Sequence, residues 1–219
     1  MEKLVIAIDG PAGAGKSTIS KLIAKKLGIN YIDTGAMYRA ITYKCLESGI
    51  EMDNTQDIIN ICKTSEIDFL DNHIYLDGKY LNDEIRSLNV SSHVSNVAKI
   101  HEVREFLVAK QREMGRKSDV VLDGRDVGTY IFPNTRYKFF LNASVDERAR
   151  RRYQELVDKG QSVSLEDIVE DIKKRDYIDS TRDFAPLVKA DDAVEVDTTS
   201  MKIEEVVSYI SNIVRKIGE

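Results

Sequence analysis

The sequence contains few of the residues that would indicate a disulfide or a metal site. Among its 219 residues are two cysteines, three histidines and three prolines. Cys45 and Cys62 lie in apolar helical patterns with no CxxC or histidine spacing around them. We therefore expect two buried, reduced thiols rather than a disulfide or a metal site. The histidines His73, His93 and His101 form no metal-ligand pattern and are expected on the surface or in packing positions.

Long apolar segments are also absent. The apolar run near the start, Leu4–Ile8, is too short for the core of a signal peptide, and Asp9-Gly10 ends it. No stretch approaches the ~20 apolar residues that a membrane-spanning helix needs. We therefore expect a cytoplasmic protein that has no membrane partner.

An excess of basic residues is lacking as well. The chain has 32 basic and 37 acidic residues and a net charge of −5, which argues against a binder of nucleic acid polymers. Hydrophobic residues make up 42% and charged residues 32%, as in ordinary soluble globular proteins. The length suits one α/β domain with small insertions. Since no apolar stripe is left without a partner inside the fold, we expect a monomer.

Apolar runs alternate with amphipathic helical patterns along most of the chain. Leu4–Ile8 is continuous, as expected of a strand buried on both faces of a sheet, and the helix after it ends at Gly28. This alternation predicts an α/β fold in which helices cover both faces of a parallel sheet. Further strands are predicted at Tyr31–Ile32, Val120–Leu122, Tyr137–Leu141 and Val194–Val196.

The segment 67–81 departs from this alternation of strands and helices. Three short apolar runs at 67–70, 74–76 and 79–81 are separated by Asp71-Asn72 and Asp77-Gly78, which are typical of tight hairpin turns. We expect a small antiparallel meander with a function of its own. A helix over 102–114 is predicted to end at Gly115, and Ser144 with Glu147 predicts a capping box at the start of a later helix.

The segment Gly10–Ser17 matches the phosphate-binding pattern GxxxxGK[ST]. Glycines allow successive backbone N–H groups to point at phosphate oxygens, and the following helix adds the positive end of its dipole. Lys16 would reach the β- and γ-phosphates, and the Ser17 hydroxyl would bind Mg²⁺. The predicted ATP-binding residues are Gly10, Pro11, Ala12, Gly13, Ala14, Gly15, Lys16, Ser17 and Thr18.

Asp123 follows the apolar run Val120–Leu122, so it is expected at the carboxyl end of a strand. An acid there reaches the Mg²⁺ shell in P-loop proteins, directly or through water. Ser17 and Asp123 are therefore the predicted metal ligands, and Mg²⁺ is the predicted cofactor.

The remaining question is which class of P-loop protein this is. A regulatory GTPase needs an [NT]KxD segment, but Val188-Lys189-Ala190-Asp191 has valine in first place. A motor or transporter ATPase is usually larger. A small-molecule kinase fits best. Such an enzyme has to hold two polyanionic substrates in line, and the many arginines in three or four segments of the chain would neutralise them. Since Arg148, Arg150, Arg151 and Arg152 share one helix, at least one of them is expected to face solvent.

Three segments resemble the signatures of the bacterial cytidylate kinases. They are Asp33–Arg39, Asp123–Thr129, and Arg175-Asp176 through Ala185-Pro186-Leu187. The likeness covers nearly the whole chain and includes the meander. It implies ATP-dependent phosphorylation of CMP and dCMP, as in pyrimidine nucleotide metabolism. A kinase for another small acceptor, such as UMP, AMP or a non-nucleotide, is the alternative.

The resemblance also implies a P-loop core built on a five-stranded parallel sheet, with two further parts. The core would comprise residues 1–62, 106–149 and 183–219. An acceptor-binding insertion would span 63–105, and a lid would span 150–182. These bounds agree with the places where the sequence pattern changes along the chain.

Site residues follow from the resemblance, position by position. Arg39, Arg125 and Arg182 would hold the acceptor phosphate. Arg175 and Asp179 would hold the ribose, with Thr34 nearby. Ser95, Arg104 and Asp126 would read the cytosine, whose N4 amino group suits the acceptor-only carboxylate of Asp126. Lys16, Arg125, Arg151 and Arg182 are the predicted catalytic residues.

Overall fold

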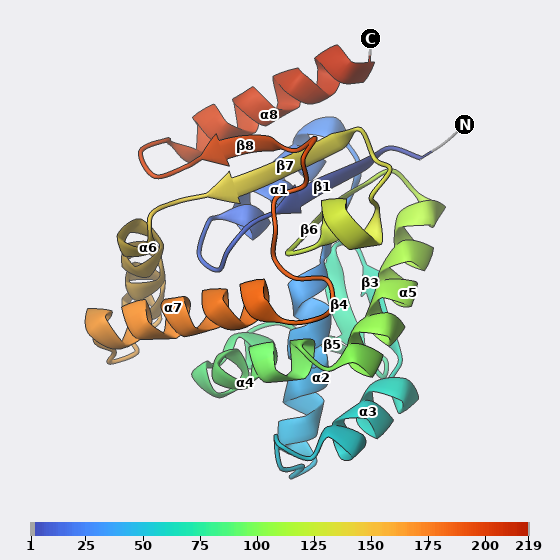
Figure 1. The fold of residues 1–219 in the computed structure, drawn as a ribbon, viewed down its shortest axis with the longest axis vertical. Helices are drawn as coiled ribbons and strands as arrows, with labels where there is room; N and C mark the ends of the chain where they lie inside the picture. Colours follow the sequence, from blue (N-terminus) through green and yellow to red (C-terminus); the bar gives the residue numbers. More distant parts are fainter. Residues whose placement is uncertain (1–2, 219) are drawn as a thin grey trace.

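The structure is a computed structural model that describes residues 3–218. Its centre is a five-stranded parallel sheet with the strand order β2-β6-β1-β7-β8 (Figure 1). Parallel strands that helices cover on both faces read as continuous apolar runs, which is how the sequence predicted them. The strands are β1 (Val5–Asp9), β2 (Asn30–Asp33), β6 (Val120–Gly124), β7 (Tyr137–Asn142) and β8 (Val194–Asp197).

Alternate residues of β1 enter two different cores. Ile6 and Ile8 pack with α1 (Lys16–Leu27) and α8 (Ile203–Gly218) on one face of the sheet. Val5 and Ala7 pack on the other face with side chains of α5 (His101–Lys117) and of the π-helical turn η2 (Val127–Ile131). Successive side chains of a strand point to opposite faces, so both faces of the sheet are buried.

The meander is present as predicted, with β3 (Ile67–Leu70), β4 (His73–Leu76) and β5 (Lys79–Leu81) paired antiparallel. Its turns use positive φ at Asp71 and Asn72 and at Asp77 and Gly78, which these residue types accept. The remaining elements between β2 and β6 are α2 (Thr34–Glu47), α3 (Thr55–Thr64), η1 (Glu84–Arg86) and α4 (Leu88–Ala98).

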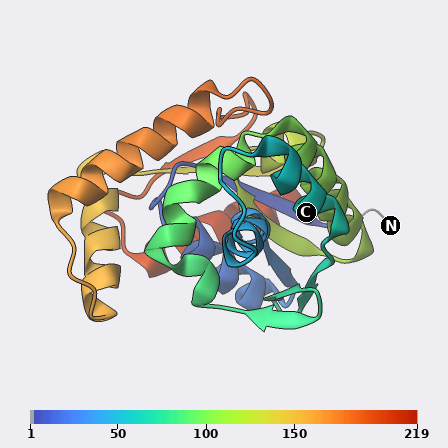
Figure 2. The ribbon, with the colours of Figure 1, turned by 90° about the horizontal axis from the view of Figure 1, so that it is seen from below.

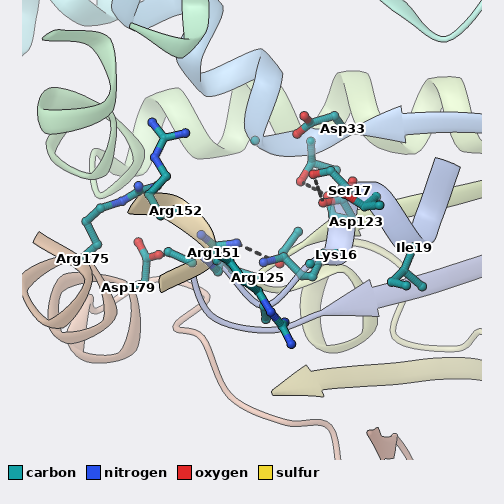
Figure 3. Close-up of a pocket in the computed structure, with 18 of the residues that line it drawn as sticks. Lys16, Ser17, Ile19, Asp33, Asp123, Arg125, Arg151, Arg152, Arg175 and Asp179 are labelled. Carbon is teal, nitrogen blue, oxygen red and sulfur yellow. Dashed lines mark hydrogen bonds and ion pairs between the residues drawn. The ribbon is translucent and has the colours of Figure 1, made fainter. Parts of the chain in front are cut away.

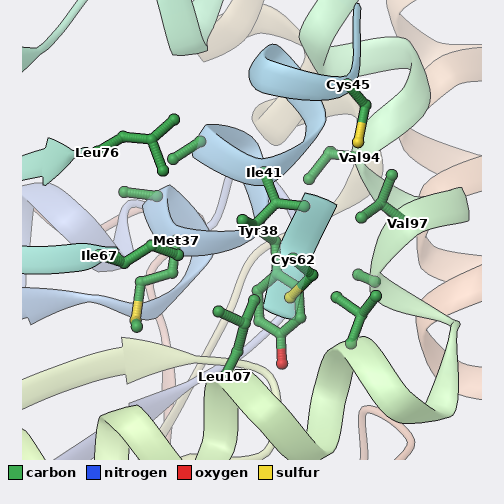
Figure 4. Packing of buried hydrophobic residues seen from close by; sticks show 14 of the residues in the cluster. Met37, Tyr38, Ile41, Cys45, Cys62, Ile67, Leu76, Val94, Val97 and Leu107 are labelled. Carbon is green, nitrogen blue, oxygen red and sulfur yellow. The ribbon is translucent and has the colours of Figure 1, made fainter. Parts of the chain in front are cut away.

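One large apolar cluster joins the meander to the helices around it (Figure 4). Met37 and Ile41 of α2 lie at its centre and are fully buried. Cys45 and Cys62 belong to the same cluster as buried free thiols, which confirms the prediction. Burial raises the pKa of Cys45 to about 11 and that of Cys62 to about 12, so both stay protonated.

Helices α6 (Val145–Asp158) and α7 (Leu165–Thr181) form a hairpin at one side of the molecule (Figure 2). They share a small apolar cluster of their own, which contains Ala149, Leu156, Ile168 and Ile172. The division of the chain into core, insertion and lid stays a prediction.

Two local predictions were wrong. Gly115 does not end a helix, because α5 continues to Lys117. A Cβ at Gly115 would lie 2.6 Å from Cζ of Phe132, so this glycine allows close packing. Ser144 does cap α6 by accepting the amide of Glu147, but the Glu147 carboxylate binds arginines of α6 instead of completing a capping box. Across residues 3–218, none of the helices is long and apolar enough to cross a membrane.

Candidate active site

The carboxyl ends of β1, β2 and β6 open into a cavity of about 910 Å³ (Figure 3). Parallel strands place their carboxyl ends at one edge, where ligands of α/β proteins usually bind. The P-loop, α2, α4, α5, α6, α7 and α8 all contribute to its lining. The predicted site residues that line it are Ala12, Gly13, Ala14, Gly15, Lys16, Ser17, Thr18, Thr34, Arg39, Ser95, Arg104, Asp123, Arg125, Asp126, Arg151, Arg175, Asp179 and Arg182.

Gly10 and Pro11 lie behind this lining. Gly10 has φ of 148°, and a Cβ there would sit 2.0 Å from the Leu141 carbonyl oxygen of β7, so only glycine allows the chain to leave β1 at this point. Gly15 is left-handed with φ of 84° and starts α1. Lys16 is buried and its Nζ donates to the Pro11 carbonyl oxygen at 2.7 Å. Burial and Arg125 lower the pKa of Lys16.

Asp123 is held by two hydroxyl groups. Ser17 Oγ donates to Asp123 Oδ2 at 3.0 Å, and the Tyr31 hydroxyl donates to Oδ1 at 2.7 Å. Burial and the neighbouring Asp33 raise the pKa of Asp123 to about 6. In the part of the chain that the structure describes, no three metal-ligating side chains cluster. A hydroxyl beside one carboxylate nevertheless fits Mg²⁺, which keeps several waters and takes its other ligands from phosphates.

Asp33, at the carboxyl end of β2, binds two arginines. Its Oδ2 accepts Arg39 Nη2 at 2.7 Å and Arg86 Nη2 at 3.2 Å, while Oδ1 accepts the Ala36 amide and caps α2. Burial disfavours the charge, but the two arginines hold the pKa of Asp33 below its usual value. Sequence reasoning missed Arg86, since a lone arginine in a short 3₁₀ turn has no local signal. Thr34 Oγ1 donates to the Asp123 carbonyl oxygen at 2.7 Å.

Arg125 and Asp179 pair across the cavity, with Arg125 Nε donating to Asp179 Oδ2 at 2.8 Å. Burial opposes the charge of Asp179, yet Arg125 and the neighbouring arginines hold its pKa below the usual value. Arg175 lies beside this pair, and within residues 3–218 its buried Nε has no hydrogen-bond partner. Burial and Arg125 lower the pKa of Arg175. This part of the cavity therefore holds positive charge that an anion would neutralise.

The predicted base-reading residues are also together. Arg104 Nη2 donates to Asp126 Oδ2 at 2.5 Å, and Arg182 Nη2 lies 3.5 Å from Oδ1. Arg104 also donates to the Ala98 carbonyl oxygen at 3.1 Å. Ser95 is buried in the adjoining wall of α4.

The arginines of α6 separate as the sequence predicted. Arg151 donates to the Thr198 carbonyl oxygen at 2.6 Å and lines the cavity near Gly15, while Arg152 lines it from the next position. Arg150 points outward with 72% of its side chain exposed. Arg148 is buried and donates to the Ala12 carbonyl oxygen of the P-loop at 2.9 Å and to Asp176 at 2.7 Å.

The segment 188–191, considered for a GTPase, does not line the cavity. Lys189 pairs with Glu195 on the surface instead. The cavity residues that were not among the predicted site residues include Asp33, Tyr38, Arg86, Glu147, Arg152 and Thr198.

The P-loop, the strand-end acid Asp123 and the arginine-lined cavity on a parallel sheet define a P-loop kinase. The family model described as cytidylate kinase matches residues 6–216, and the chain belongs to this family. A cytidylate kinase of Clostridioides difficile (strain 630) is 61% identical over 96% of this chain and 97% of its own. One of Alkaliphilus oremlandii (strain OhILAs) is 56% identical over 99% of this chain and 100% of its own.

A crystal structure of an uncharacterized protein from Eubacterium ventriosum ATCC 27560 shares the fold. It is 12% identical, covers 98% of this chain and 99% of its own, and has a TM-score of 0.53. At that identity the likeness concerns the fold alone.

Proposed function

We propose that the protein transfers the γ-phosphoryl group of ATP to CMP or dCMP and so forms ADP and CDP or dCDP. A phosphate oxygen of the acceptor attacks the γ-phosphorus in line, while the bond to the oxygen that bridges it to the β-phosphorus breaks. The observation that carries the proposal is that one cavity joins the P-loop to a cluster of buried arginines. Membership of the cytidylate kinase family supports the choice of acceptor.

The cavity suits this reaction because the acceptor needs no strong base. The second pKa of a phosphate monoester is near 6, so the attacking oxygen is already ionised at pH 7. The protein has to bring two polyanions together and neutralise them, which is a task for arginines. We also expect a lid to close over ATP and exclude water from the cavity, so that water does not hydrolyse ATP in place of the transfer.

On the donor side, we assign the P-loop amides and Lys16 to the phosphates of ATP. Ser17 and Asp123 would hold Mg²⁺, directly or through water, and Tyr31 would keep the Asp123 carboxylate oriented. When bound, the ion would neutralise phosphate charge as the phosphoryl group moves. We also assign Arg151, whose guanidinium lies beside Gly15, to the same phosphates.

On the acceptor side, we assign Arg39, Arg125 and Arg182 to the phosphate. Arg175 and Asp179, with Thr34 nearby, would hold the ribose. Ser95, Arg104 and Asp126 would read the base. We further propose that residues 63–105 form the acceptor-binding insertion, that 150–182 close as a lid, and that the protein acts as a monomer.

A panel of acceptors tests the proposal. CMP, dCMP, UMP, AMP and glycerol would be supplied separately with ATP and Mg²⁺, and ADP release would be measured. We expect CMP and dCMP to give the largest kcat/KM. A larger value for AMP or glycerol would identify a kinase of another specificity, and equal values for CMP and UMP would refute base reading by Asp126.

A further inference from the structure

Asp9 is the last residue of β1, directly before the P-loop, and has no role in the reaction described so far. Its side chain is buried, and its two carboxylate oxygens have separate partners. Oδ1 accepts the backbone N–H of Val127 at 2.8 Å, and Oδ2 accepts the backbone N–H of Gly128 at 2.7 Å. A carboxylate is the side chain that can accept both, since it has no donor to oppose either amide.

These hydrogen bonds connect the two halves of the active site. Asp9 leads into the P-loop, which faces ATP. Val127 and Gly128 directly follow Arg125 and Asp126, which face the acceptor. The link spans 118 and 119 residues of sequence.

Two glycines allow this approach. A Cβ at Gly124 would lie 2.6 Å from Thr34 Oγ1 and 2.8 Å from a methyl carbon of Val127. A Cβ at Gly128 would lie 3.2 Å from Lys138 and 3.4 Å from Asp9 Oδ2. A side chain at Gly124 would therefore have to displace Thr34 or Val127, and one at Gly128 would crowd Lys138 and the Asp9 carboxylate.

The P-loop itself has other supports. Arg148 donates to the Ala12 carbonyl oxygen, and Lys16 donates to that of Pro11. Loss of the Asp9 carboxylate would therefore release the acceptor loop more than the P-loop. Burial is also costly for Asp9, whose pKa it raises to about 7 despite the two amides. A strongly shifted pKa beside the active site marks Asp9 as a candidate for a functional role.

We propose that Asp9 is a positioning residue for acceptor binding, whose carboxylate holds the loop bearing Arg125 and Asp126 in place beside the P-loop. The proposal rests on the proposed function, since it takes CMP as the acceptor.

The test compares Asp9→Asn with wild type and with Asp119→Asn. Asp119 is a matched control because its carboxylate also accepts a backbone amide, that of Leu4, but at the opposite end of β1. Binding of CMP without ATP, and of ATP without CMP, would be measured by calorimetry, and KM for each substrate by ADP release. For Asp9→Asn we expect CMP affinity to fall about tenfold or more, because a charge-assisted hydrogen bond is lost. ATP affinity should change less than about twofold.

Gly128→Ala probes the same contact from the loop and decides the matter if Asp9→Asn does not fold. It should likewise weaken CMP selectively. An equal loss of CMP and ATP affinity, or a CMP affinity like that of wild type, in the variant that folds would overturn the proposal. If wild type does not phosphorylate CMP, the proposed function itself fails and the inference falls with it. If wild type does phosphorylate CMP, an Asp9→Asn variant whose CMP affinity equals that of wild type refutes only the inference about Asp9.

Discussion

Arg104 and Asp126 form an ion pair 2.5 Å long in which both side chains are almost completely buried. The other oxygen of Asp126 lies 3.5 Å from Arg182. The carboxylate thus faces the cavity with cationic neighbours on both oxygens. A base that binds here has to offer a hydrogen-bond donor, which the N4 amino group of cytosine does and the O4 carbonyl of uracil does not.

Replacing Asp126 with asparagine should therefore weaken discrimination between bases. We expect the ratio of kcat/KM for CMP to that for UMP to fall by about tenfold to 150-fold, since an asparagine amide can donate to the O4 of uracil, which the acceptor-only carboxylate cannot do. Steady-state assays with both nucleotides measure this. Asp192→Asn is the control, because the Asp192 side chain is 64% exposed and does not line the cavity. An unchanged ratio in Asp126→Asn would mean that another residue reads the base.

Lys16→Ala should stop turnover without unfolding the protein. We expect kcat to fall at least about 100-fold, as when other preorganised charges at a transferring group are removed. Burial lowers the pKa of Lys16, so its charge opposes folding and its removal should leave the melting temperature nearly unchanged. Lys25→Ala, at an exposed position of the same helix, is the control. Retained activity would reject the P-loop assignment.

Tyr31→Phe should reduce the affinity for Mg²⁺. The variant keeps the buried ring but loses the hydroxyl that orients Asp123. Loss of such an outer partner typically costs about 10- to 100-fold in metal affinity. We expect the Mg²⁺ concentration for half-maximal rate to rise accordingly, and Mn²⁺ binding measured by calorimetry to weaken in parallel. Tyr209→Phe, on exposed α8 surface, should change neither. Unaltered metal binding in Tyr31→Phe would show that Asp123 needs no such support.

Asp9→Asn should also change how stability depends on pH. Because the pKa of Asp9 rises from 3.8 to about 7 on folding, the folded protein keeps this proton to higher pH than the unfolded chain. Protonated Asp9 therefore makes its full contribution to the unfolding free energy of wild type below about pH 4. This contribution is lost as pH rises through 7, by up to about 4 kcal/mol. The unfolding free energy of the variant, minus that of wild type, should increase between pH 4.5 and 8.

Urea denaturation at both pH values measures that difference. The charged groups around Asp9 are Lys16 on α1, Asp126 before η2, Asp123 on β6 and Lys138 on β7. Asp123, whose pKa is about 6, titrates in the same range, but it is present in both proteins and largely cancels. A difference that stays constant with pH would show that Asp9 keeps its charge on folding without cost.

Gly115→Ala should destabilise the protein although alanine favours helices by about 1 kcal/mol over glycine. The new methyl group would lie 2.6 Å from the Phe132 ring, and overpacking of this kind costs about 1–3 kcal/mol. Urea denaturation measures the loss. The double variant Gly115→Ala with Phe132→Leu should recover part of it. A stabilised single variant would mean that the ring moves away freely.

The sequence alone determined the elements whose signals are local. The continuous run before Gly10, the glycines around Lys16 and the turn residues Asp77-Gly78 each act on their immediate neighbours, so the strand, the P-loop and the hairpin could be predicted. Membership of the family could be predicted for the same reason, because its motifs are contiguous. The prediction that a helix ends at Gly115 was wrong, because a glycine in a helical pattern indicates a break unless something packs against it.

Only the tertiary structure decided which groups the buried carboxylates meet. The partners of Asp33, Asp9 and Asp126 come from η1, η2 and α5, at separations of 53, 118 and 22 residues. A hydrogen bond or an ion pair forms wherever the fold brings suitable groups together, and no periodicity in the chain encodes that choice. The residues predicted to bind substrate lie in contiguous motifs, and the fold brings most of them to one cavity. The residues that hold them in position could not be predicted, because they act through space rather than along the sequence.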